Sequence, residues 1–228
     1  MGSEPAARPA RRPLTIGVPK GRILTELTPL FGRLGIDLTV FAGDSRKLLV
    51  DVAERAGVPA HRLLLLRPTD VPTYVEAGVA DLAACGSDTL EENGADVLEP
   101  LDLGVGRCRL SVAGPASLAA GGLGAFTRVR VATKYPSITR QFFRARGIEA
   151  TIIHLYGSVE LAALAGLSDL VVDLVSSGAT LRENGLAELE TIRTISTRLV
   201  VNRASLKTRH GEIARLLETL EAGLGGAT

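Results

Sequence analysis

The sequence feature that most constrains the fold is an apolar run that ends in a cluster of small, hydroxylated residues. Residues 170–175 (LVVDLV) are mostly leucine and valine, a composition typical of a strand buried on both faces. Ser176, Ser177 and Gly178 follow, and residues 179–181 (ATL) can begin a helix. A buried strand that leads through a short loop into a helix is typical of α/β folds with parallel sheets.

This strand-to-helix junction has the composition of a phosphate-binding loop. The first amides of a helix lack partners within it, and with the Ser176, Ser177 and Thr180 hydroxyls they can donate to a phosphate dianion. Gly178 allows close approach of the backbone or a positive φ. Asp173, near the end of the strand, is placed to hold ribose hydroxyls or a magnesium ion. Taken alone, the segment is explained equally well as an ordinary turn with a Thr N-cap.

Composition limits the class of protein. The 228 residues suffice for one large domain or two lobes, each with its own core. The net charge is +1 and the basic residues are interspersed with acids, so we expect no nucleic-acid and no membrane partner. Cys85 and Cys108 each lie beside an apolar run, which favours buried reduced thiols over a disulfide framework. No apolar run approaches the length that spans a membrane, so we expect a cytoplasmic protein. Residues 1–13, rich in Arg, Ala and Pro, are predicted to be a disordered tail.

Strand and helix patterns alternate along the chain without a hairpin signal, which predicts mostly parallel sheets. The glycine-spaced segment at residues 101–107 breaks this rhythm and indicates a crossing into a second lobe. We therefore expect lobe I to comprise residues 14–104 and 179–228, and lobe II residues 105–178. The final helix carries a stripe of leucines that covers either the core or a partner, and periodicity does not separate the two.

Several polar residues stand where a strand pattern gives way to a helix pattern. Lys20 and Arg22 follow the first strand and are predicted to point at the carboxyl edge of the sheet, although a solvated basic turn explains them as well. Asp70 has the position of a helix N-cap. Glu91 and Glu92 are expected on the exposed side of a helix that follows Gly86.

Six segments, in order from residue 20 to residue 181, together resemble the ATP phosphoribosyltransferase family, which catalyses the first step of histidine biosynthesis. The length also matches the short form of that family, which lacks a C-terminal regulatory domain. The segments are KGRIL (20–24), DVPTYVE (70–76), GRCRL (106–110), VATKYP (131–136), GSVELA (157–162) and VDLVSSGATL (172–181).

The resemblance implies a two-lobed α/β fold like that of type II periplasmic binding proteins, with the active site in the cleft. It implies transfer of the 5-phosphoribosyl group from phosphoribosyl pyrophosphate to N1 of ATP, which releases pyrophosphate and inverts C1 of the ribose. Phosphoribosyl pyrophosphate is expected to bind at Asp173, Ser176, Ser177, Gly178, Ala179 and Thr180. Mg²⁺ is expected to accompany the pyrophosphate, and no residue is assigned to it.

Cations are the side chains that this reaction needs most, because negative charge grows on the pyrophosphate as the bond to the ribose breaks. Arg22 and Arg46, each in a segment similar to the family, are the predicted catalytic residues. The adenine N1 already carries a lone pair, so no general base is assigned. Ser87 departs from the family, since many members have lysine there. Further substrate contacts are expected at Lys20, Gly21, Asp70, Gly86, Arg107, Lys134 and Glu160.

The family also implies partners. A homodimer is expected, which joins a regulatory subunit resembling histidyl-tRNA synthetase in a hetero-octamer. Two other functions compete with this interpretation. A type I phosphoribosyltransferase needs a pair of acids where this chain has Val172 and Asp173. A small-molecule-binding protein of the same bilobal fold needs neither the phosphate loop nor the arginines.

Overall fold

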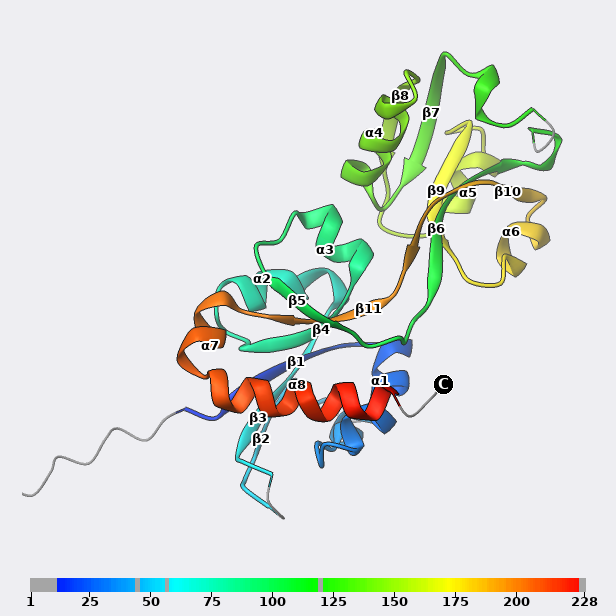
Figure 1. Cartoon of the computed structure of the whole chain (residues 1–228). Coiled ribbons are helices and arrows are strands. Elements are labelled where there is room, and N and C mark those ends of the chain that lie inside the picture. The colour runs from blue at the N-terminus through cyan, green and yellow to red at the C-terminus, as the bar shows by residue number, and fades with distance from the viewer. Residues whose placement is uncertain (1–11, 44–45, 56–57, 119–120, 226–228) are drawn as a thin grey trace, which may run out of the picture.

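The computed structural model describes residues 12–43, 46–55, 58–118 and 121–225. Two β-sheets, each with its own helices and apolar cores, form two lobes that are joined by two crossings of the chain (Figure 1). This is the predicted two-lobed α/β architecture. None of the helices in the described residues combines the length and apolar character that a membrane crossing requires.

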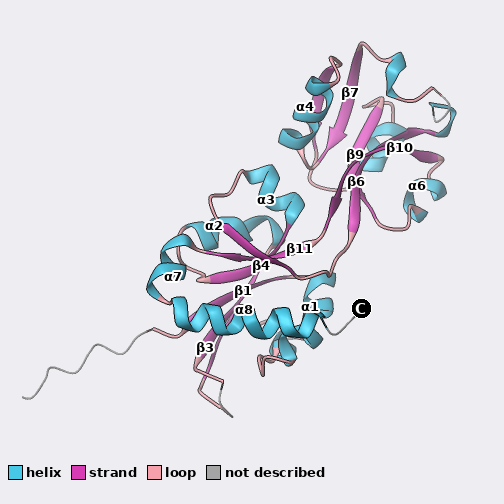
Figure 2. Ribbon diagram, viewed as in Figure 1, coloured by secondary structure: helices cyan, strands magenta, loops and turns pink. Residues whose placement is uncertain are grey.

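The sheet of the first lobe has the strand order β2-β3-β1-β4-β11-β5 and helices on both faces (Figure 2). Apolar side chains of β1 and β3 pack against α1 and α8 on one face, and those of β3 and β4 pack against α2 and α3 on the other. The elements are β1 (Leu14–Pro19), α1 (Arg22–Gly32), β2 (Leu49–Val52), β3 (His61–Leu66), α2 (Val71–Glu76), β4 (Leu82–Gly86), α3 (Ser87–Asn93), β5 (Leu98–Asp102), β11 (Thr197–Val201), α7 (Arg203–Thr208) and α8 (His210–Gly225).

The leucine stripe of the last helix covers the core of the first lobe. Ile213 and Leu220 of α8 are fully buried against β1 and α1, and Leu216 and Leu224 are half-buried in the same cluster. Of the two roles that the sequence left open for this stripe, the structure therefore shows the packing role.

The second lobe has a smaller sheet with the strand order β10-β6-β9-β7-β8. Helix α4 packs against β7 and β8 on one face, and α5 and α6 lie on the other. The elements are β6 (Cys108–Pro115), β7 (Arg128–Thr133), α4 (Pro136–Ala145), β8 (Glu149–His154), α5 (Val159–Leu164), β9 (Leu170–Val175), α6 (Ala179–Glu183) and β10 (Leu186–Ile195).

The first crossing between the lobes lies where the glycine pattern predicted it, between Asp102 and Cys108. The second crossing lies at Ser196, not at residue 178, so the predicted assignment of residues 179–195 to lobe I is wrong. Strand β10 pairs with β6 along its whole length, from Leu186 opposite Pro115 to Ile195 opposite Cys108. This pairing joins segments that are far apart in the sequence, and nothing in the local pattern of β10 reveals it.

Both sheets are mixed, although mostly parallel sheets were predicted. Strands β3, β1 and β4 run parallel, as do β8, β7 and β9. The antiparallel neighbours are β2 at one edge, β5 and β11 at the other, and β6 and β10 in the second lobe. Strands β6 and β11 each follow a crossing from one lobe to the other, whereas β2 and β3 are consecutive strands of the first lobe that pair with one another.

The segment just before β1 is attached to the first lobe. Arg12 donates to both carboxylate oxygens of Asp81, at 2.7 and 2.8 Å, and Asp81 is fully buried. The same carboxylate accepts from Arg209 at 3.1 Å and from Ser205 at 2.6 Å. Arg12 and Pro13, the last two residues of the predicted disordered tail 1–13, are therefore ordered, and residues 1–11 lie outside the described residues.

Candidate active site

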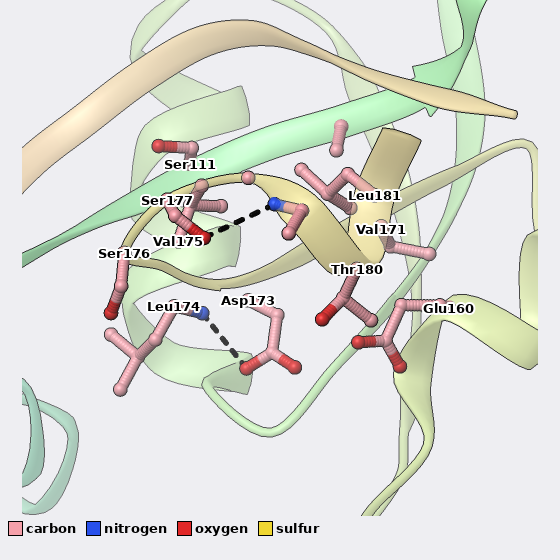
Figure 3. A pocket seen from close by; sticks show the side chains of 13 residues that line it. Ser111, Glu160, Val171, Asp173, Leu174, Val175, Ser176, Ser177, Thr180 and Leu181 are labelled. Atoms are coloured by element: carbon pink, nitrogen blue, oxygen red, sulfur yellow. Dashed lines mark hydrogen bonds between the residues drawn. The ribbon is translucent and has the colours of Figure 1, made fainter. Parts of the chain in front are cut away.

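The loop that follows β9 lines a cavity of about 170 Å³ in the second lobe (Figure 3). All six residues predicted to bind phosphoribosyl pyrophosphate line this cavity, and so does Glu160. The remaining lining residues come mainly from β6, β9 and α6. The full lining is Ser111, Ala113, Glu160, Val171, Asp173, Leu174, Val175, Ser176, Ser177, Gly178, Ala179, Thr180 and Leu181.

The loop has the conformation that its glycine and hydroxyls predicted. Gly178 is the N-cap of α6 with φ = 71°, in the left-handed region that a side chain resists. The Ser177 hydroxyl accepts the Ala179 N–H at 3.3 Å, and the Ser177 carbonyl accepts from Arg182 at 3.0 Å. These bonds hold the loop, while the side chains of Ser176 and Thr180 stay exposed.

Asp173 is the carboxyl in this cavity whose pKa is shifted by its surroundings. Its Oδ1 accepts the Leu174 N–H at 2.9 Å, and its Oδ2 lies 3.8 Å from the Lys134 ammonium. Burial raises the pKa of Asp173, the Leu174 N–H and Lys134 oppose that rise, and the charge of Glu160 adds to it. Lys134 and Glu160, both predicted as weaker substrate contacts, therefore act electrostatically on Asp173.

The cavity has two chemically different sides. Hydroxyls and amides of the β9–α6 loop are donors, and the carboxylates of Asp173 and Glu160 are acceptors (Figure 3). A sugar phosphate presents the complementary arrangement, because its phosphate oxygens accept and its hydroxyls donate. The cavity thus suits a ribose 5-phosphate group better than either a bare anion or an apolar ligand.

Ser111 lines the cavity although it was not among the site residues predicted from the sequence. It lies opposite Asp173 in the register of β6 and β9, and its hydroxyl donates to Glu188 at 2.7 Å. Glu188 also accepts two bonds from Arg109, at 3.0 and 2.8 Å, and these contacts lower its pKa to about 2. The signal in the sequence was a serine inside the strand predicted at residues 108–113.

The first-lobe candidates Lys20, Gly21 and Arg22 form the junction between β1 and α1. Gly21 is the N-cap of α1 with φ = 91°. The Arg22 guanidinium lies 3.2 Å from Glu26, whose second carboxylate oxygen accepts the Gly106 N–H at the first crossing. Glu26 therefore connects Arg22 to this first crossing between the lobes, which we call the hinge.

Arg22 also lies within electrostatic range of the second lobe. Burial raises the pKa of the Cys108 thiol at the start of β6, and Asp88 raises it further. Arg22 opposes this rise, whereas Asp173 adds a small one. Arg22 and Asp173, from different lobes, thus influence the pKa of the same thiol in opposite directions.

Two predicted cations are exposed. Arg46 precedes β2, in the segment next to the carboxyl end of β3. Arg107 lies in the first crossing, where its Nε donates to the Gly104 carbonyl at 3.2 Å. Within the described residues, no hydrogen bond or ion pair connects either arginine to the cavity of the second lobe.

Asp70 and Gly86 lie at the carboxyl ends of β3 and β4. Asp70 occupies the N-cap position of α2, but its carboxylate accepts from the Thr69 hydroxyl at 3.0 Å and caps no helix amide. Gly86 is tightly packed, because a Cβ there would lie 2.3 Å from Oδ1 of Asp88. Both residues are at the carboxyl edge of the parallel strands of the first sheet.

Acidic residues of α3 connect the two lobes, a role that the sequence did not predict. Glu92 accepts the Ser137 and Ile138 amides at the start of α4, at 2.8 and 3.0 Å, and Asp88 accepts from the Tyr135 hydroxyl at 2.9 Å. Glu91 pairs with Arg193 of β10. Glu91 and Glu92 are half-buried, so their predicted exposure is wrong.

Comparisons with known proteins agree with this geometry. The family described as HisG, ATP phosphoribosyltransferase, matches residues 67–222. A curated ATP phosphoribosyltransferase 2 from Geobacter sulfurreducens is 52% identical over 209 residues, which cover 91% of this chain and 97% of that protein. The chain belongs to the ATP phosphoribosyltransferase family. It transfers the 5-phosphoribosyl group of phosphoribosyl pyrophosphate to N1 of ATP, the first step of histidine biosynthesis.

Other relatives extend the comparison. An ATP phosphoribosyltransferase from Sorangium cellulosum is 51% identical over 216 residues, 95% of this chain and 98% of that protein. The solved ATP phosphoribosyl transferase (HisG:HisZ) complex from Thermotoga maritima contains a chain with a TM-score of 0.76 and 35% identity, over 92% of this chain and 97% of that one. The periplasmic aliphatic sulphonate binding protein SsuA from Escherichia coli, at 15% identity and a TM-score of 0.61 over 92% of this chain and 72% of that one, shares the fold alone.

Proposed function

We propose that the 5′-phosphate of phosphoribosyl pyrophosphate binds on the loop formed by Ser176, Ser177, Gly178, Ala179 and Thr180, and that Asp173 accepts bonds from the ribose hydroxyls. The observation that supports this proposal is that all these residues line one cavity. The left-handed Gly178 keeps side chains away from the loop amides. Glu160 and Lys134 act through the charge of Asp173, which must be ionised to accept two hydroxyls.

We assign stabilisation of the negative charge on the leaving pyrophosphate to residues of the first lobe. As C1 of the ribose breaks its bond to pyrophosphate, the lone pair of adenine N1 forms the new bond on the opposite face. Arg22 and Arg46 neutralise the charge that grows on the leaving group. The connection of Arg22 to the hinge through Glu26 supports this role, since release of that ion pair frees the guanidinium for pyrophosphate.

The remaining predicted contacts, at the cleft edge of the first lobe and at the hinge, are proposed to touch ATP and pyrophosphate. Those of the first lobe lie at or after the ends of β1, β3 and β4, whose parallel carboxyl ends meet at one edge of the sheet, and Arg107 lies in the first crossing. These residues are Lys20, Gly21, Asp70, Gly86 and Arg107.

Mg²⁺ is proposed to enter with the substrate. Mg²⁺ usually keeps several waters and binds substrate phosphates with one or two carboxylates. Asp173 and Glu160 are carboxylates of that kind beside the proposed ribose site. When bound, the ion shields the charge of pyrophosphate, while the residues of this chain orient the ribose.

We also propose that the chain is a homodimer that assembles with a regulatory subunit resembling histidyl-tRNA synthetase into a hetero-octamer. The similarity to a chain of the HisG:HisZ complex supports a separate regulatory partner. Both cysteines are free thiols, which supports a role in the reducing cytoplasm.

Replacing Thr180 with valine tests the phosphate site, because it removes one donor and keeps the shape of the side chain. We expect ribose 5-phosphate to inhibit the variant about tenfold more weakly, with the KM for ATP unchanged. Thr151→Val is the matched control, since Thr151 is exposed on β8 and lies outside the cavity. Equal inhibition of Thr180→Val and wild type refutes the assignment of the 5′-phosphate.

A further inference from the structure

Helix α3 of the first lobe contacts the second lobe through three acidic residues. Asp88, Glu91 and Glu92 stand at positions i, i+3 and i+4, so their side chains lie on one face of the helix. Figure 1 shows α3 at the border between the lobes. The contacts are Asp88 to the Tyr135 hydroxyl, Glu91 to the Arg193 guanidinium, and Glu92 to the Ser137 and Ile138 amides. We call these three contacts the α3 clamp.

Glu92 supplies the N-terminal cap that α4 lacks in its own segment. Tyr135, the N-cap residue of α4, makes no side-chain cap hydrogen bond. The Ser137 and Ile138 amides instead donate to the Glu92 carboxylate, at 2.8 and 3.0 Å. Such amides have no partner inside the helix, and the positive end of the helix dipole stabilises a carboxylate there. A residue of the first lobe therefore completes a helix of the second, and both bonds break if the lobes rotate apart.

The two crossings form a narrow ribbon between the lobes. The Leu103 N–H donates to the Thr197 carbonyl at 2.9 Å, and the Thr197 N–H donates to the Val105 carbonyl at 3.0 Å. Gly104 and Gly106 lie in this ribbon with positive φ. Domains move relative to one another unless a large apolar interface joins them, and a few loop residues suffice as the hinge. Contacts away from the ribbon, such as the α3 clamp, are therefore needed to fix the angle between the lobes.

The proposed reaction depends on this angle because its two halves bind to different lobes. The cavity assigned to ribose 5-phosphate is lined by residues between Ser111 and Leu181, all of the second lobe. Arg22 and Arg46, assigned to the pyrophosphate, belong to the first lobe. A misplacement of the reacting groups by about 1 Å can slow a reaction by about 10². Binding of ribose 5-phosphate, by contrast, needs the second lobe alone.

We propose that the α3 clamp holds the lobes at the angle that the transfer reaction requires, with Glu91 and Glu92 as positioning residues that contact no substrate. This role rests on the proposed placement of ribose 5-phosphate in the second lobe and of pyrophosphate beside the first. A loosened clamp slows transfer between bound substrates and leaves the affinity for ribose 5-phosphate unchanged. A role in folding of the second lobe would instead weaken both.

Exchanging the charges of Glu91 and Arg193 tests the clamp without altering the cap of α4. Glu91→Arg and Arg193→Glu each place like charges in contact, whereas the double variant restores an ion pair with the charges exchanged. We expect each single variant to lower the single-turnover rate at saturating substrates at least about tenfold, and the double variant to recover most of it. All three should bind ribose 5-phosphate as wild type does. Glu218→Arg, exposed on α8, controls for the change of charge and should keep the wild-type rate.

Three results of this experiment would overturn the proposal. They are wild-type turnover in both single variants, a double variant no faster than the single ones, and weaker binding of ribose 5-phosphate in the single variants. An error in the ribose phosphate assignment shows separately, in unchanged inhibition of Thr180→Val by ribose 5-phosphate, because the clamp is intact in that variant.

A distance measurement tests the clamp independently of the reaction. Nitroxide labels at Thr151→Cys on β8 and Glu218→Cys on α8 place one exposed label on each lobe, with Cys108 replaced by serine so that it takes no label. Double electron–electron resonance should give a wider distance distribution for Glu92→Ala than for the labelled parent. Glu92→Gln should keep the narrow distribution, because its amide oxygen still accepts an N–H. Equal widths for Glu92→Ala and the labelled parent would show that the clamp does not fix the angle between the lobes.

Discussion

Replacing Lys134 with methionine should raise the pKa of Asp173 and move the acid limb of the pH–activity profile to higher pH. The ammonium lies 3.8 Å from the carboxylate, a separation at which two unit charges interact by about 1 kcal/mol in water and about 4 kcal/mol at an effective dielectric of 20. Lys134 is 38% and Asp173 18% exposed, so solvent screening favours the lower figure. One kcal/mol corresponds to about 0.7 of a pKa unit.

The assay is the pH dependence of kcat/KM for phosphoribosyl pyrophosphate, which reports ionisations of the free enzyme. Removing a cation disfavours the carboxylate, so the acid limb of Lys134→Met should lie about 0.7 of a pH unit higher than that of wild type. Glu160→Gln should shift it to lower pH, because the charge of Glu160 raises the pKa of Asp173. Lys134→Arg is the control that keeps the cation. Acid limbs that coincide in wild type, Lys134→Met and Glu160→Gln would refute the electrostatic role of Lys134.

Three further outcomes are expected. Arg22→Ala should lower the single-turnover rate by about 10² to 10³, because its charge acts mainly in the transition state; a change confined to the KM for ATP would contradict this role. Glu188→Gln should cost about 1–2 kcal/mol of unfolding free energy at pH 7 after allowance for its 27% exposure. Folding lowers the pKa of Glu188 from 4.5 to about 2, so urea titrations should show this cost vanish as the pH falls through that range. A difference in unfolding free energy between wild type and variant that stays constant with pH would contradict this role of the Glu188 charge. Histidine should inhibit the chain only when the regulatory partner is added, as measured by pyrophosphate release, and strong inhibition of the chain alone would place a histidine site within it.

The parts of the site that could be predicted are those encoded in contiguous sequence. The apolar run, the serines and Gly178 specify a strand, a left-handed turn and a helix locally, and the structure has all three. The first crossing was visible for the same reason, because the glycines at 104 and 106 both have positive φ. Asp173 was recognised by its place in that run, but the rise in its pKa comes from burial and from Glu160, which the sequence does not show.

The parts that could not be predicted depend on contacts between distant segments. Strand β10 has an ordinary strand pattern, and only its pairing with β6 places it in the second lobe. Glu92 was assigned to solvent because it lies on the polar side of α3, yet the amides at the start of α4 occupy that side. His61 has no feature in the sequence that marks it as buried with an unpaired nitrogen.

The most direct test of phosphate binding on the β9–α6 loop is the affinity for phosphoribosyl pyrophosphate when Gly178 is replaced with valine. Gly147, at the end of α4 and distant in sequence from the loop, has the same φ of 71° and controls for the backbone strain of a β-branched residue, whereas a Cβ at residue 178 would in addition lie 3.1 Å from Nη1 of Arg182. Calorimetry of the folded variants should show at least about a tenfold loss of affinity for Gly178→Val, about 1.4 kcal/mol, and wild-type affinity for Gly147→Val. Wild-type affinity in a folded Gly178→Val would show that the 5′-phosphate does not bind on this loop.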